Sequence, residues 1–251
     1  MTDIAIQIID NYIELGGPGS GNWGHAGRKG KRGGSLPRSR AMSRRTGKDW
    51  RKRQAAAKRI AAKGHTPPTD SAMHEDRLHS SLTEKDKGVI RRAVANLPQE
   101  HLDKVYGIEK RHIPGAEGRC RGNYIELNSE TYGAHNRRIW HKATVVHEIG
   151  HVVQNHNSQY GDRRYVEDFG KFYREKKGRV GIHPSALRAE ATKAGGPRKG
   201  FPSRYSQKDH KELFAESYQM YTSAPKTLQK RAPEIYEYMR DDVFGGVEYI
   251  K

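Results

Sequence analysis

The residues best suited to chemistry lie in the segment His147-Glu148-Ile149-Gly150-His151, within an apolar run from Thr144 to Val153. In a helix of 3.6 residues per turn, positions 147 and 151 lie one turn apart on one face, so both imidazoles can bind a single metal ion. Glu148 follows the first histidine, where its carboxylate can take a proton from a water molecule that the ion activates. The five-residue pattern also occurs by chance, so the rest of the site must be found elsewhere in the chain.

A catalytic zinc ion usually has three protein ligands, and two histidines supply only two. The metzincin extension needs Gly at 154 and His at 157, but these positions hold Gln154 and Asn157. The gluzincin solution takes a glutamate from a later helix, and Glu212 and Glu216 lie one helical turn apart in Glu-Leu-Phe-Ala-Glu. One should bind the ion and the other should hydrogen-bond a ligand histidine. Spacing alone does not decide which glutamate has which role.

Three ordered blocks of sequence resemble the catalytic domain of anthrax lethal factor-like zinc metalloproteases. The blocks are Ser203–Ser206, Asp209 with Glu212–Tyr218, and Ala232–Met239, and the similarity covers roughly residues 100–245. The resemblance implies that Glu212 is the third ligand of one zinc ion, that Glu216 orients a histidine, and that Tyr205 stabilises the transition state. It also implies a zincin-like α+β fold and endopeptidase activity on a protein or peptide substrate.

The elements that must position these residues are a small mixed sheet, the metal-binding helix and C-terminal helices. Thr83 is a helix N-cap followed by acids, and apolar residues at helical spacing continue until Pro98. Strands are expected at 105–108 and 123–128. Helices are expected at 140–153, 163–177, 211–221 and 233–239, with a surface loop at 178–204 that has room for a short helix near 185–192. An edge strand at 124–128 should align an extended substrate by backbone pairing.

Composition separates a flexible basic region, residues 1–70, from a folded domain at 71–251. Only 33% of residues are apolar and 30% are charged, too polar for the whole chain to pack into one core. Between residues 26 and 63, fifteen Lys/Arg and the single acid Asp49 supply +14 of the net charge of +18. The glycine-rich tract at 16–35 disfavours regular structure, whereas residues 47–63 are predicted to form a basic helix.

The basic segment suits several partners. It can bind DNA nonspecifically, and an acidic protein or a membrane surface would suit it equally well. A solvated basic linker or assembly tail also explains the charge. Residues 16–35 resemble a glycine-rich signature of tailed-phage minor head and head-morphogenesis proteins, which implies a phage or prophage origin and capsid or host proteins as targets. The candidate DNA contacts are Arg44, Arg45, Arg51, Lys52, Arg53, Lys58 and Arg59.

The sequence is therefore consistent with three functional hypotheses. The first is an active metalloprotease, and the second is a phage head or DNA-associated structural protein whose zincin domain is inactive. The third is a protease that the basic arm packages or delivers. The intact set of predicted site residues favours an active enzyme.

The remaining features concern location. Cys120 is the only cysteine, so no disulfide can form within the chain. No apolar run approaches the roughly 18 residues needed to span a membrane. Residues 1–15 mix apolar and acidic residues and lack the basic start of a secretory signal. We therefore expect no membrane span, and a location in the host-cell cytoplasm or in the virion.

Overall fold

The computed structural model describes residues 67–130, 138–159, 164–180, 183–191 and 195–249. These residues form an α+β structure with a three-stranded mixed sheet and eight α-helices, so the predicted class is correct. The basic segment, the glycine-rich tract and the candidate DNA contacts at 44–59 lie outside the described residues.

The helices agree with most of the predicted ranges, with two additions. Helix α4 follows Pro98, and α9 was not predicted. Within the described residues, no helix has both the length and the apolar composition needed to cross a membrane. The helical elements are η1 (Glu75–Arg77), α3 (Glu84–Val94), α4 (Gln99–Leu102), α5 (Arg138–Gln159), α6 (Arg164–Val180), α7 (Pro184–Glu190), η2 (Tyr205–Gln207), α8 (His210–Ser223), α9 (Pro225–Arg231), α10 (Pro233–Tyr238) and the π-helical turn η3 (Met239–Val243).

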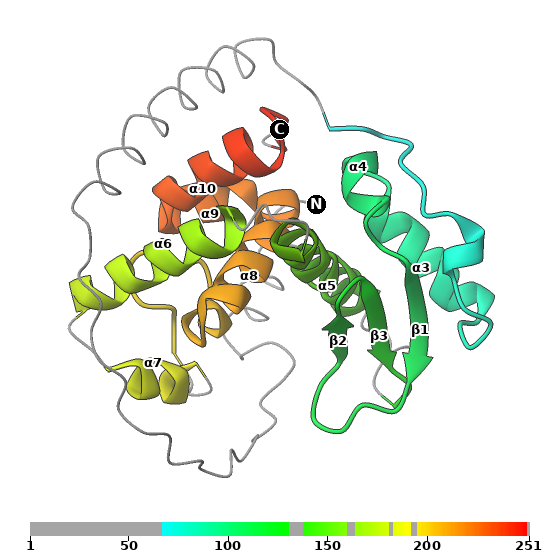
Figure 1. Cartoon of the computed structure of the whole chain (residues 1–251), viewed down its shortest axis with the longest axis horizontal. Coiled ribbons are helices and arrows are strands. Elements are labelled where there is room, and N and C mark those ends of the chain that lie inside the picture. The colour runs from blue at the N-terminus through cyan, green and yellow to red at the C-terminus, as the bar shows by residue number, and fades with distance from the viewer. Residues whose placement is uncertain (1–66, 131–137, 160–163, 181–182, 192–194, 250–251) are drawn as a thin grey trace.

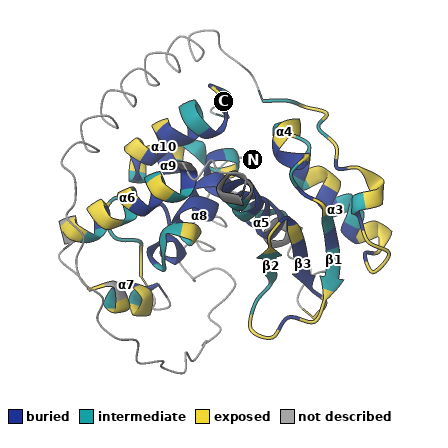
Figure 2. Ribbon diagram, in the orientation of Figure 1, coloured by how far each residue is buried: buried dark blue, intermediate teal, exposed yellow. Residues whose placement is uncertain are grey.

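Helix α5 lies at the centre of the molecule (Figure 1). On one side it packs against α3 and the sheet, and on the other side against α6 and α8. Val145, Ile149 and Val152 of α5 are completely buried. They belong to one apolar core cluster that includes residues of all these elements, and the dark blue parts of the α5 and α8 ribbons in Figure 2 mark buried residues. The His-Glu-x-x-His pattern therefore lies on a helix that is packed on both sides within this core.

The sheet has the strand order β1-β3-β2. Strand β3 (Tyr124–Asn128) is central, pairing in parallel with β1 (Gly107–Arg111) and antiparallel with β2 (Gly118–Arg121). The prediction that 124–128 is an edge strand is therefore wrong, because β3 is paired on both sides. The edge strand next to α5 is β2, whose sequence Gly-Arg-Cys-Arg lacks the apolar alternation that indicates a strand.

Gly150 allows α5 and α8 to cross at short range. A Cβ atom on Gly150 would lie 3.1 Å from Ala215 Cα and 3.1 Å from Tyr218 Cβ, closer than the roughly 3.5–4.0 Å of a normal carbon contact. At the start of α8, the Asp209 side chain accepts a hydrogen bond from the backbone N–H of Glu212, as an N-cap does. The crossing and the cap together fix the position of Glu212 relative to α5.

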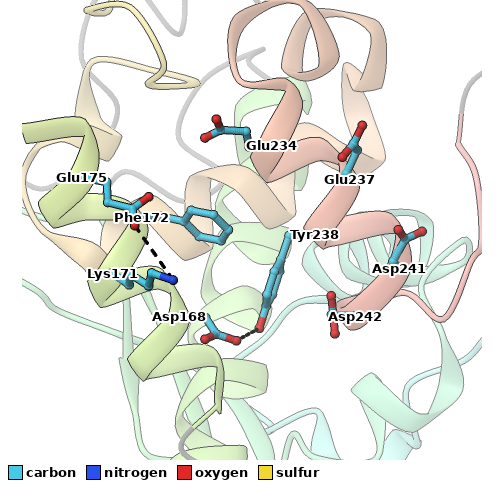
Figure 3. Close-up of a pocket in the computed structure, with 9 residues that line it drawn as sticks. All are labelled: Asp168, Lys171, Phe172, Glu175, Glu234, Glu237, Tyr238, Asp241 and Asp242. Atoms are coloured by element: carbon cyan, nitrogen blue, oxygen red, sulfur yellow. Dashed lines mark hydrogen bonds and ion pairs between the residues drawn. The ribbon is translucent and has the colours of Figure 1, made fainter. Parts of the chain in front are cut away.

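Aromatic side chains fill the space between α6, α8 and α10. The ring of Phe169 lies 4.8 Å from that of Phe214 and 5.5 Å from that of Tyr238, centroid to centroid. Outside this layer, α6, α10 and η3 line a groove of about 310 Å³ that combines two aromatic rings and one lysine with six carboxylates (Figure 3). The Tyr238 hydroxyl donates to Asp168 there, at 2.8 Å. None of the predicted site residues lines this groove.

Candidate metal centre

Three predicted ligands meet where α5 and α8 cross. Nε2 of His147 lies 3.2 Å from Oε2 of Glu212, and Nε2 of His151 lies 3.3 Å from the same oxygen. These separations are close to the ~3.4 Å between tetrahedral ligands that lie about 2.0–2.2 Å from zinc. Oε2 of Glu212 is buried and accepts no hydrogen bond from a described residue. The three ligand atoms all lie within 4.8 Å of one another, so the group could hold a metal ion.

Glu216 fixes the orientation of the first histidine. Its Oε1 lies 2.9 Å from Nδ1 of His147, a hydrogen-bond distance. A carboxylate in this place favours the tautomer that has its proton on Nδ1, which leaves the lone pair of Nε2 for a metal ion. Glu212 and Glu216 therefore lie on opposite sides of the same imidazole.

The second oxygen of Glu212 is held by two donors. The Tyr205 hydroxyl donates to Oε1 at 3.2 Å, and the Lys208 ammonium donates to the same oxygen at 2.8 Å. Lys208 also donates to the Tyr205 hydroxyl oxygen at 2.9 Å. The two oxygens of the Glu212 carboxylate therefore have different neighbours: Oε2 lies near the two imidazoles, and Oε1 lies near Tyr205 and Lys208.

Glu148 lies buried beside the ligands and close to β2. A Cβ atom on Gly118 would lie 2.9 Å from Oε1 of Glu148 and 2.9 Å from Cγ2 of Thr144, so a larger residue at this position would displace these side chains or the strand. Burial raises the pKa of Glu148, although the charges of His147 and His151 oppose this effect. A carboxyl group with a raised pKa is suited to take up and return a proton.

Electrostatics keep Glu212 ionised. Burial by itself disfavours a charged Glu212, but its contacts with His147 and His151 outweigh burial and hold its pKa well below the usual range. Burial also disfavours the charged form of His147, but its contacts with Glu212 and Glu216 outweigh burial and raise its pKa, so a metal ion that binds Nε2 would displace a proton. Glu212 therefore carries a negative charge at neutral pH, which is the form that binds a cation.

A cleft of about 360 Å³ opens over these residues. Strand β2 lines one part of it through Gly118, Arg119 and Cys120, and Lys208 and Lys211 line another. Within the described part of the chain, β2 pairs with β3 alone. The cleft thus combines the ligand cluster with an edge strand.

The structure brings the six predicted site residues together in one place. Sequence reasoning missed Gly118 and Lys208, which complete the surroundings of Glu148 and Glu212. The only signal for Lys208 was its position between Tyr205 and Glu212, and a solvated lysine fits the same position. The six residues are His147, Glu148, His151, Tyr205, Glu212 and Glu216.

Comparisons with protein-family models, with curated proteins and with solved structures give no match. The family resemblance therefore rests on the three sequence blocks. The functional argument rests on the geometry of the cluster itself.

Proposed function

We propose that the protein is a zinc-dependent endopeptidase with a zincin-like catalytic domain, in which His147, His151 and Glu212 bind one zinc ion. The convergence of two Nε2 atoms and one buried carboxylate oxygen is the observation that carries this proposal. Two histidines and one glutamate, with a fourth position left for water, are typical of catalytic zinc sites. Magnesium and calcium prefer oxygen ligands alone, so the two imidazoles favour zinc.

The residues around the cluster supply the remaining chemistry. Zinc would polarise a peptide carbonyl and lower the pKa of water from about 15.7 toward roughly 7. Glu148 takes the proton of the attacking water and passes it to the leaving amine. The Tyr205 hydroxyl donates to the carbonyl oxygen as that oxygen becomes negative. Glu216 holds His147 in the tautomer that can bind a metal.

An extended peptide substrate can bind beside β2 by backbone pairing. Backbone pairing with an edge strand gives affinity for many sequences, and specificity then comes from the side-chain pockets. Strand β2 takes this role in place of β3, because β2 is the edge strand whose residues line the cleft.

The biological setting is proposed from sequence alone. The glycine-rich tract suggests a phage or prophage protease that acts on capsid or host proteins in the host-cell cytoplasm or virion. The basic segment supplies the proposed contact with DNA or capsid proteins. Both features lie outside the described residues.

Replacement of the proposed general base tests the function. Glu148→Gln in the full chain should abolish zinc-dependent cleavage of casein and leave one zinc ion bound, as measured by metal analysis. Glu237→Gln changes an exposed glutamate of the groove between α6 and α10, and should cleave normally. A wild-type protein that binds zinc but cleaves neither casein nor phage and host proteins would instead support the structural, inactive zincin. Wild-type activity in Glu148→Gln would disprove the role of Glu148.

A further inference from the structure

We propose that Lys208 is a positioning residue of this metal centre, which restricts Glu212 to coordination through Oε2 alone and holds the Tyr205 hydroxyl beside that ligand. The inference rests on the proposed function, since it concerns how the same site presents its third ligand. It assigns a role to a lysine that the sequence motifs leave out.

The contacts of Lys208 form a closed triangle. Its ammonium lies 2.8 Å from Oε1 of Glu212 and 2.9 Å from the Tyr205 hydroxyl, which itself lies 3.2 Å from the same Oε1. The ammonium also lies 4.9 Å from the centroid of the Tyr205 ring, within the range of a cation–π contact. One cation therefore contacts a metal ligand and the proposed transition-state donor at once.

The backbone that carries Lys208 is itself held in place. The Tyr173 hydroxyl, from α6, donates to the carbonyl oxygens of Gln207 and Lys208 at 2.7 and 3.2 Å. The backbone N–H of Lys208 donates to the Tyr205 carbonyl at 3.0 Å, which closes the turn η2. Asp209 then caps α8. Lys208 is thus fixed between a hydrogen-bonded turn and the start of the helix that carries Glu212.

The position of the ammonium has a direct consequence for coordination. A carboxylate can bind a metal ion through one oxygen or through both. An ammonium on Oε1 repels a divalent cation from that oxygen and occupies its lone pairs, whereas Oε2 remains open toward the two imidazoles. Single-oxygen binding leaves a coordination position for water or for a substrate carbonyl.

Lys211 provides a matched control. It lines the same cleft and carries the same charge, but within the described residues its ammonium has no hydrogen-bond or ion-pair partner. Any effect of a lost positive charge on the cleft as a whole should therefore be similar for both lysines. An effect on the ligand should be specific to Lys208.

The test uses the full chain loaded with Co²⁺, whose visible absorption is strong in a four-coordinate site and weaker at higher coordination number. We expect Lys208→Met to weaken this absorption, because Glu212 can then bind through both oxygens. Lys208→Arg, which keeps N–H donors near Oε1, should restore it, and Lys211→Met should match the wild type. Casein cleavage by the zinc-loaded Lys208→Met protein should show kcat lowered about tenfold with KM little changed.

The outcomes separate this inference from the proposed function. A wild-type Co²⁺ spectrum in Lys208→Met, or an equal change in Lys211→Met, would overturn the role of Lys208 while leaving the metalloprotease intact. Failure of the wild-type chain to bind Co²⁺ or Zn²⁺ would overturn the proposed function and this inference with it. Circular dichroism checks that each variant is folded, and Lys208→Ala is a second variant that removes the same donor.

Discussion

Gly150→Ala tests whether the close crossing of α5 and α8 sets the geometry of the site. The added Cβ would lie 3.1 Å from atoms of Ala215 and Tyr218, about 0.4–0.9 Å less than a normal carbon contact. Overpacking of this kind costs about 1–3 kcal/mol, and the better helix propensity of alanine returns roughly 1 kcal/mol. We therefore expect a net loss of about 0–2 kcal/mol, which lowers the melting temperature by up to roughly 8 °C.

Function should suffer more than stability. To relieve the contact, α8 must move by several tenths of an ångström, and Glu212 lies one turn from Ala215 on this helix. Because a misplacement of about 1 Å can cost about a hundredfold in rate, we expect casein cleavage to fall at least ~10-fold.

Thermal unfolding, a zinc competition titration and the cleavage assay measure these effects together. Gly170→Ala is the matched control, because its Cβ would meet only the flexible Arg174 side chain at 3.4 Å and should stabilise α6. A Gly150→Ala protein with the melting temperature, zinc affinity and activity of the wild type would refute the reasoning.

Four further predictions follow from the same contacts. Glu216→Ala should lower zinc affinity about 10–100-fold in a chelator competition titration, because His147 loses its partner at 2.9 Å; wild-type affinity would disprove the orienting role. Gly118→Ala should suppress cleavage but keep zinc bound, since the new methyl would displace the Glu148 carboxylate. Full activity would contradict this, because it would mean that β2 moves away and leaves Glu148 in place. Zinc at about 100 times its Kd should raise the free energy of unfolding by about 2.7 kcal/mol, and a chelator should reverse this; a melting temperature unaffected by zinc would contradict binding to the folded state. Burial lowers the pKa of His101 to about 3, so as the pH falls below about 6.5 this histidine takes up a proton in the unfolded chain but not in the folded chain. From pH 7 to pH 5 this difference should lower the free energy of unfolding by about 2 kcal/mol. Urea unfolding should show this loss in the wild type, and His101→Gln should lack the part of the pH dependence that His101 causes.

Helices were predictable where a local signal sufficed. The Thr83 N-cap, predicted as a helix start, is present at α3, where Thr83 and Asp86 form a capping box. The aromatic spacing of α6 and the apolar run of α5 likewise reflect contacts that each helix makes with the core. The ends were less precise, because α5 extends through polar residues to Gln159 and α6 continues past Gly178 to Val180.

The sheet and the surroundings of the ligands were less predictable, because they depend on distant neighbours. Strand β2 forms because β3 offers a partner and not because Gly-Arg-Cys-Arg favours a strand. Gly118 is required by the approach of Glu148, 30 residues later in the chain. Lys208 resembles any surface lysine until Glu212 and Tyr205 are seen beside it. Residue types alone do not encode such pairings.

The two glycines beside the motif also bear on how such sites are recognised in divergent sequences. Gly150 lies inside His-Glu-x-x-His, and Gly118 lies in the edge strand β2, 30 residues before Glu148. Gly150 allows the close approach of α8, which carries Glu212, and Gly118 allows the close approach of β2 to Glu148. A pattern search that demanded a residue without a side chain at both places would discard many chance occurrences of the five-residue motif, because a helix flanked by bulky residues leaves no room for either neighbour.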